Sequence, residues 1–287
     1  MTEPGHSACI VLVMTLHPPR PRRLRSSTAW FVALTCATLL LPAHLPADPV
    51  HARLPEGLVH GFLVLRNMAG TMLANGDLIQ VNRGGLVSSR LVFHFKDGSV
   101  HDETAVFSQR GDFKLLTDHL VQKGPAFTQP LDMAIDTEAG QVSVRYTEDG
   151  KEKVKKEQME LPPDLSNGML IVLLKNLDAS QVPKTVSFVA ATPAPQLVKL
   201  VISTAPADAF TIAGSARKAT HYVVAVHIGG LKGVIAPLVG KQPPDVHLWI
   251  MPGDAPAFVK SEGPMYPGGP PWRVELTSPV WPAGSTR

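Results

Sequence analysis

Short segments in which hydrophobic and polar residues alternate recur along the chain. The clearest examples are residues 91–96, 131–136, 142–147, 186–188 and 198–203. Period-two alternation is typical of a β-sheet that has one face on a core and the other in water. Turn-forming pairs such as Asp97-Gly98 and Asp149-Gly150 separate the segments, and the connections are too short for the crossovers of a parallel sheet. The pattern therefore predicts a mainly β protein, with a single antiparallel, strongly curved sheet or half-barrel.

One segment has helical spacing instead. Two prolines and Asp164 resemble a helix start, and five apolar residues then fall on one face. Those residues are Leu165, Met169, Val172, Leu173 and Leu177. We expect one inserted α-helix at about 164–177, docked on the sheet. The lysine-rich residues 151–158 before it are expected to form an edge strand whose charges discourage pairing with another chain.

The first 52 residues have the features of an export signal. Four arginines, at positions 20, 22, 23 and 25, precede the apolar run Ala29–Leu41. This run is shorter than the roughly 20 residues that a membrane-spanning helix needs, but it fits the core of a signal peptide. Small residues place cleavage after Ala52 or Ala47. We expect residues 1–52 to be removed and residues 53–287 to form a single β-rich domain with a Gly/Pro-rich C-terminal segment, exported to the periplasm or outside the cell.

Composition narrows the functions that are open to this domain. The chain has 287 residues, of which 44% are hydrophobic and 18% charged, so it is not a disordered protein. Without the leader, 23 basic and 22 acidic residues remain, and this near balance makes nucleic acid an unexpected partner. Both cysteines, Cys9 and Cys36, leave with the leader. Because no nucleotide-binding, nucleophile or zinc-protease motif is present, no cofactor and no catalytic residue is predicted.

The hairpin around Asp97-Gly98 raises one alternative. A two-residue turn there would place His94 opposite His101, with Glu103 on the same side. Two histidines and a carboxylate could bind zinc and leave a position open to water, as in a metal-dependent hydrolase. The competing interpretation is the polar face of an amphipathic hairpin.

The loop between two later predicted strands is unusually apolar. Residues 234–239 are hydrophobic and lie between Gly233 and Gly240. An apolar loop has to be covered by the fold, by a partner or by lipid. Together with the helix and the aromatic residues near the C-terminus, it provides the residues that we expect to contact an apolar ligand. These are Met169, Leu173, Val234, Ile235, Leu238, Trp249 and Trp272.

Several stretches resemble a group of uncharacterised bacterial exported proteins. They are FHFKDGSVHDETAVFSQ at 93–109, VQKGPAF at 121–127, PPDLSNGM at 162–169, GKQPPDVHLWI at 240–250 and FVKSEGPMYPGGPPWRVEL at 258–276. That group has no assigned activity, so the resemblance gives no residue a role. The order of leader, antiparallel strands and inserted helix is also similar to that of periplasmic lipoprotein carriers. In those proteins an incomplete barrel holds acyl chains under a helical lid, and here the similarity is one of architecture only.

The features together favour a non-catalytic binding or carrier protein of the cell envelope. The expected ligand is a lipid or another apolar small molecule, with possible contact to a membrane surface but no transmembrane span in the mature chain. Two alternatives stay open, namely the metal-dependent hydrolase and an envelope scaffold protein that docks through the apolar loop 233–240.

Overall fold

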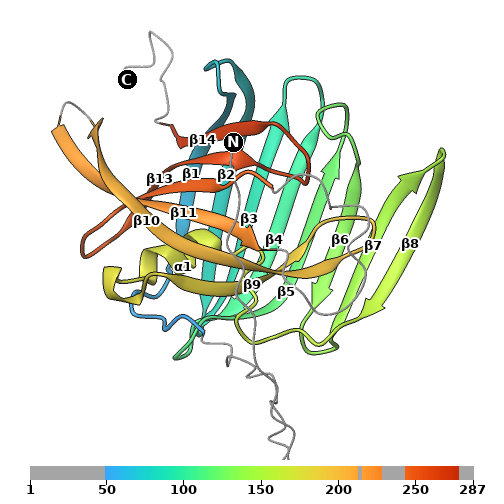
Figure 1. Ribbon diagram of the computed structural model, residues 1–287, viewed down its shortest axis with the longest axis horizontal. Coiled ribbons are helices and arrows are strands. Elements are labelled where there is room, and N and C mark those ends of the chain that lie inside the picture. The colour runs from blue at the N-terminus through green and yellow to red at the C-terminus, as the bar shows by residue number, and fades with distance from the viewer. Residues whose placement is uncertain (1–48, 213–214, 228–242, 278–287) are drawn as a thin grey trace, which may run out of the picture. The chain divides into compact units, whose positions relative to one another are not determined.

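The computed structural model describes residues 49–212, 215–227 and 243–277 (Figure 1). All of them belong to one compact unit, Leu45–Arg287. The strands are β1 (Val59–Asn67), β2 (Met72–Arg83), β3 (Leu86–Phe95), β4 (Val100–Ser108), β5 (Lys114–Lys123), β6 (Leu131–Asp136), β7 (Gln141–Glu148), β8 (Lys151–Gln158), β9 (Lys184–Ala190), β10 (Gln196–Ile212), β11 (Ser215–His227), β12 (Val246–Met251), β13 (Ala257–Pro264) and β14 (Pro271–Leu276). One α-helix, α1 (Leu170–Asn176), and a short 3₁₀ helix, η1 (Ala179–Gln181), lie between β8 and β9.

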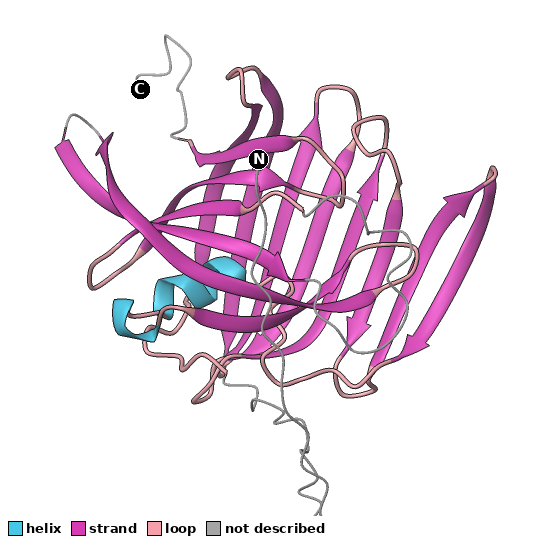
Figure 2. Ribbon diagram, in the orientation of Figure 1, coloured by secondary structure: helices cyan, strands magenta, loops and turns pink. Residues whose placement is uncertain are grey.

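The fourteen strands form one antiparallel sheet in the order β8-β7-β6-β5-β4-β3-β2-β1-β14-β13-β12-β11-β10-β9. The order describes two meanders, β1 to β8 and β9 to β14, which are joined where the first strand pairs with the last. Leu63 pairs with Leu276 and Asn67 with Trp272 at this junction. The sheet has two edge strands, β8 and β9, and it bends so that β9–β11 cross in front of β3–β5 with α1 in view between them (Figures 1 and 2). The predicted curved, antiparallel, mainly β fold is confirmed.

Alternation in the sequence appears as alternation of burial. Along β3, Val87, Ser89, Phe93 and Phe95 are buried, while their neighbours on the other face are mostly exposed. Most of the buried hydrophobic side chains of both meanders belong to one hydrophobic core. Within it, four aromatic rings from distant parts of the chain pack together with centroid separations of 5.4 to 6.2 Å. They are Phe95, Phe127, Tyr266 and Trp272.

The helix begins later than the sequence suggests. Its apolar face is buried as predicted, but α1 starts at Leu170, and Asp164 does not cap it. The Asp164 carboxylate instead accepts a 2.6 Å hydrogen bond from the Ser187 hydroxyl on β9, and Leu165 forms a parallel bridge with the same serine. Residues 164–167 are thus held against β9, so only the last part of the predicted segment forms a helix.

Candidate functional site: a cavity between the two meanders

A cavity of about 1060 Å³ lies between the two meanders. Its volume is at the upper end of the range of about 300–1,000 Å³ that is common for small-molecule sites. Strands of both meanders, α1 and the loops beside β12 to β14 contribute to its wall. The apolar residues of the wall include Leu78, Leu91, Leu120, Leu170, Ile171, Phe188, Val198, Leu200, Val224 and Phe258. A cavity of this size and lining suits a ligand that has a substantial hydrocarbon part.

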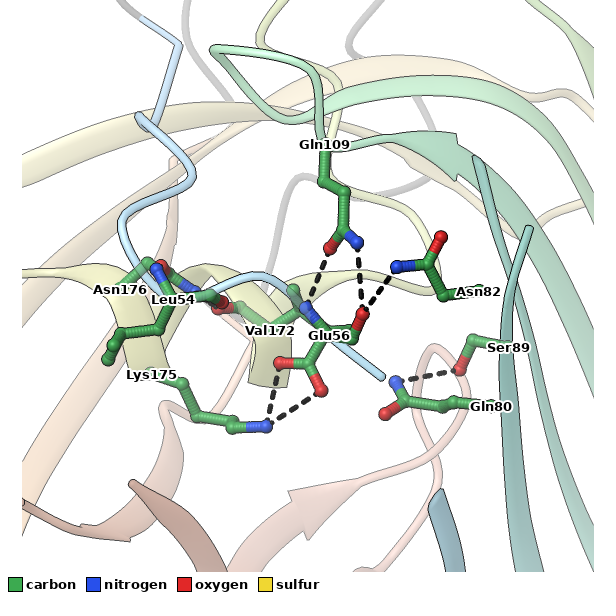
Figure 3. A network of polar contacts seen from close by, with 9 residues as sticks. All are labelled: Leu54, Glu56, Gln80, Asn82, Ser89, Gln109, Val172, Lys175 and Asn176. Carbon is green, nitrogen blue, oxygen red and sulfur yellow. Dashed lines mark hydrogen bonds and ion pairs between the residues drawn. The ribbon is translucent and has the colours of Figure 1, made fainter. Parts of the chain in front are cut away.

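The helix forms one side of the cavity, and a buried ion pair ties it to the segment that precedes β1. Lys175 of α1 lies 2.7 and 2.9 Å from the two carboxylate oxygens of Glu56, whose side chain is only 3% exposed (Figure 3). The Glu56 backbone is held in turn: its N–H donates to Gln109 Oε1 at 2.7 Å, and its carbonyl accepts from Gln109 and Asn82. Removing one partner of such a buried pair typically costs about 3–5 kcal/mol. The helix is therefore fixed in position rather than resting loosely on the sheet.

Polar side chains interrupt the apolar lining on the β2–β5 side. On β2 and β3, Gln80 donates a 3.2 Å hydrogen bond to Ser89, and both residues line the cavity. On β4 and β5, the strand register places four more polar residues on this same face, because His101 pairs with Gln122, Glu103 with Leu120, and Ala105 with Asp118. These four are His101, Glu103, Asp118 and Gln122. His101 and Glu103 line the cavity directly.

The hydrogen bonds of Gln122 determine the state of His101. The Gln122 amide nitrogen donates to the backbone carbonyl of Met265 at 2.8 Å and lies 3.1 Å from His101 Nδ1. Since a backbone carbonyl can only accept, the orientation of the amide is assigned, and Nδ1 is the acceptor of its second hydrogen. The proton of the imidazole is then on Nε2. Burial lowers the pKa of His101 to about 4, which keeps the ring neutral at neutral pH.

Two polar atoms of this pair have no partner. His101 Nε2 and Gln122 Oε1 are both buried and make no hydrogen bond within the described residues. A buried donor or acceptor left unpaired costs about 1–3 kcal/mol. The pair thus presents one unfilled donor and one unfilled acceptor beside the cavity.

The carboxyl groups of Glu103 and Asp118 also lack hydrogen-bond and ion-pair partners among the described residues. Both oxygens of Asp118 are buried and unpaired, and the structure shows no hydrogen bond or ion pair to Glu103 among the described residues. Burial raises the pKa of Glu103 to about 7, and burial together with the nearby charge of Glu103 raises that of Asp118 well above its ordinary value. Glu103 is partly exposed, but the space it faces is the cavity.

A glycine covers Asp118. Gly168 has φ +63°, and a Cβ built there would lie 2.5 Å from Ala105 Cβ and 2.9 Å from Asp118 Oδ1. Only a residue without a side chain fits over the carboxyl at this point, because both the space and the backbone conformation exclude one.

The hairpin that suggested a metal site has a different register. Its turn contains three residues, Lys96 to Gly98, because the Phe95 N–H bonds the Ser99 carbonyl. His101 therefore pairs with Phe93, and His94 pairs with Val100. His94 is exposed on the outer face and His101 is buried on the inner one, so the prediction that His94, His101 and Glu103 share a face is wrong. No group of three potential metal-binding side chains occurs in the part of the chain that the structure describes.

Four of the residues predicted to contact a ligand lie in the described part of the chain, and none of these four lines the cavity. Met169, Leu173 and Trp272 are buried in the core but are not among the residues that line it. Trp249 lies on the opposite face of β12 from the lining, where it stacks on His221 at 4.2 Å between ring centroids and lies under the Lys260 ammonium. Val234, Ile235, Leu238 and the apolar loop 233–240 fall outside the described residues. On α1, the lining comes instead from Leu170, Ile171, Val172 and Lys175.

Sequence reasoning missed Asp118 and Gln122. A signal for them exists: on β5 the period-two pattern places both on the face of Leu120, a hydrophobic residue that points inward. A polar residue at an inward position indicates a candidate functional residue, because burying a polar group without a partner costs free energy.

Comparison with known proteins gives little further information. No family model matches the chain, and no curated protein matches it. One solved structure, described as a β-barrel-like protein of a domain of unknown function, DUF1849, from Brucella abortus, is similar with a TM-score of 0.43 and 10% sequence identity. The match covers 79% of this chain and 100% of that one. No helix in the described ranges is both long and apolar enough to span a membrane.

Proposed function

We propose that this protein is a non-catalytic carrier or binding protein for an apolar or lipid-like ligand. The cavity of about 1060 Å³ between the two meanders is the observation that carries this proposal. Apolar side chains, among them many of leucine, valine and proline, line most of it, so an alkyl chain can be buried without any specific polar contact. Each buried methylene contributes about 0.8 kcal/mol.

Several features of the chain support a role in the cell envelope. Arginines followed by a short apolar run are typical of an export signal, and we propose that the protein acts in the periplasm or outside the cell. Contact with a membrane surface, where a carrier would load or release its ligand, belongs to the same proposal. The polar contacts of Lys175 and Glu56 support a cavity whose helical side stays in place when the ligand leaves.

The proposal is tested by binding of N-phenyl-1-naphthylamine, an uncharged apolar fluorophore, to the full-length protein. We expect saturable binding, with increased fluorescence, and displacement by dodecan-1-ol. Leu91→Trp should weaken binding about tenfold or more, because Leu91 on β3 lines the cavity and the larger indole side chain would occupy space that the probe needs.

Leu86→Trp provides the matched control. Leu86 is on the same strand, is 40% exposed and does not line the cavity. The two variants carry the same substitution, so a loss of binding in Leu91→Trp alone locates the probe in the cavity. Absence of probe binding to the wild-type protein, or equal loss in both variants, would contradict the carrier function.

A further inference from the structure

Four polar residues at one side of the cavity form an incomplete hydrogen-bonding site. His101 Nε2, Gln122 Oε1 and both oxygens of Asp118 are buried and unpaired, and Glu103 faces the cavity beside them. All four side chains lie on one face of the adjacent strands β4 and β5. Buried polar atoms without partners are uncommon in folded proteins and require an explanation. A ligand whose polar head supplies the missing partners provides one.

The charges at this side of the cavity restrict the kind of head group. The site has two carboxyl groups, and the neutral imidazole of His101 adds no positive charge. The cation that lines the same cavity, Lys175, is already bound by Glu56 at 2.7 and 2.9 Å. A carboxylate or phosphate head group would therefore find no free cation among the described residues that line the cavity, and an ionised Glu103 would repel it. An ammonium group would instead stabilise the ionised form of Glu103, whose pKa burial raises to about 7.

We propose that this site binds the protonated amine of a long-chain amine, whose alkyl chain lies along the apolar part of the cavity. The inference rests on the proposed carrier function and names its ligand class. The ammonium group has three donors and no acceptor, which matches the Glu103 carboxylate on the cavity wall. The unpaired oxygens of Gln122 and Asp118 lie behind this wall and make the same side electronegative. Hydrogen bonds between ionised groups are shorter and stronger than neutral ones, so the amine adds affinity beyond burial of the chain.

The unfilled donor of the site extends the description of the ligand. His101 Nε2–H requires an acceptor, which an ammonium group cannot supply. A hydroxyl oxygen close to the amine can supply it. Among long-chain amines, those with a neighbouring hydroxyl group therefore also provide the acceptor that His101 lacks.

The test compares three probes that share one alkyl chain: dodecylamine, dodecan-1-ol and dodecanoate. Each displaces N-phenyl-1-naphthylamine from the full-length protein at neutral pH. We expect dodecylamine to bind about tenfold or more tightly than dodecan-1-ol, and dodecanoate to bind most weakly. Glu103→Gln should reduce the preference for dodecylamine over dodecan-1-ol about tenfold, with both probes measured on the same variant.

Asp102→Asn is the matched control. Asp102 is the neighbour of Glu103 on β4, but it lies on the outer face, where Arg90 binds it. It should leave the order of the three probes unchanged. If Glu103→Gln fails to bind the fluorophore, Asp118→Asn is measured in its place, and the wild-type probe order decides independently of both variants.

The outcomes separate the two proposals. If the wild-type protein binds the fluorophore but the three probes bind equally, or dodecanoate binds most tightly, the amine site is wrong and the carrier function stands. The amine site is also wrong if a folded Glu103→Gln or Asp118→Asn variant keeps the full preference for dodecylamine. If neither fluorophore nor probes bind, the carrier function itself fails.

Discussion

The two walls of the cavity obey the same alternation of inward and outward residues but differ in what they place inside. On the β2–β5 wall the inward side chains include Gln80, Ser89, His101 and Glu103. Along β9–β12 the lining is apolar apart from Gln196, where β10 begins. Its members on these strands are Phe188, Ala190, Val198, Leu200, Val224, Val226 and Val246.

This difference indicates that the apolar wall contributes mainly to stability and the polar wall mainly to ligand recognition. An apolar wall gains free energy from burial whether or not a ligand is present. The β4–β5 part of the polar wall places Glu103 and Asp118 inside without counter-charges, which destabilises the ligand-free protein. Natural sequences are expected to depart from local consistency at functional sites, and here the departure is confined to one side of the cavity.

The largest effect is expected when the apolar wall is given a carboxyl group. Val224 on β11 is 1% exposed and pairs with Ile202 and Val246, so Val224→Asp buries a similar volume with a charge that no neighbour compensates. We expect the free energy of unfolding to fall by about 4 kcal/mol, measured by urea denaturation.

Val223→Asp is its control, because Val223 is the adjacent residue on the other face and pairs with Ser203 and His247. It should cost less than about 1 kcal/mol. If both variants lost the same unfolding free energy, the structure's assignment of Val224 to the inner face and Val223 to the outer face of β11 would be wrong.

Sequence patterns predicted the strands well and the inward polar residues poorly, for a physical reason. Alternation fixes which residues share a face within a strand, but the pairing between strands depends on turn geometry. At the β3–β4 hairpin, one additional turn residue moved the partner of His101 from His94 to Phe93. Trp249 shows the other limit, since it lies between the inward residues Leu248 and Ile250 on a strand where either face could be apolar.

Long-range pairing was beyond sequence reasoning. The junction of β1 with β14 and the bridge from Leu165 to Ser187 join segments that no local pattern connects. The bridge also explains why the helix is shorter than its apolar spacing indicates. The carboxylate of Asp164, a good helix cap by composition, found a partner on β9 instead.

A change of pH is expected to have an intermediate effect on the free energy of unfolding. The direction of this effect tests whether the carboxyl groups of the polar wall are buried without counter-charges. Burial raises the pKa of Glu103 from 4.5 to about 7 and raises that of Asp118 well above its ordinary value. The folded protein therefore holds protons that the unfolded chain has released, so the free energy of unfolding falls as pH rises from about 4.5 through about 7. His101 acts in the opposite sense below pH 6.5, because its pKa is lowered to about 4 in the folded state.

The melting temperature of the ligand-free protein should accordingly be lower at pH 8 than at pH 6.5, with a difference in unfolding free energy on the order of 1–3 kcal/mol. Glu103→Gln should reduce this difference, since the amide does not titrate. A wild-type protein whose stability rises over this range would mean that the carboxyls are compensated and the polar wall is not strained.

The smallest effect is expected one residue away, on the outer face of the same wall. Arg90 donates to both oxygens of Asp102 at 2.9 and 2.6 Å, and this bond lowers the pKa of Asp102, opposite in direction to the shift of its neighbour Glu103. Because the Arg90 side chain is 55% exposed, solvent and salt screen the pair, and Asp102→Asn should cost less than about 1 kcal/mol, decreasing further at high salt. The Arg90–Asp102 pair loses its contribution to stability only as pH falls below the ordinary Asp pKa of 3.8. The contribution of Glu103 to stability changes instead between pH 4.5 and about 7. Urea denaturation of Asp102→Asn and Glu103→Gln at pH values from 3 to 8 tests this difference between the outer and the inner carboxyl group. If Asp102→Asn lost as much unfolding free energy as Val224→Asp, the assignment of inner and outer faces on which the site depends would be contradicted.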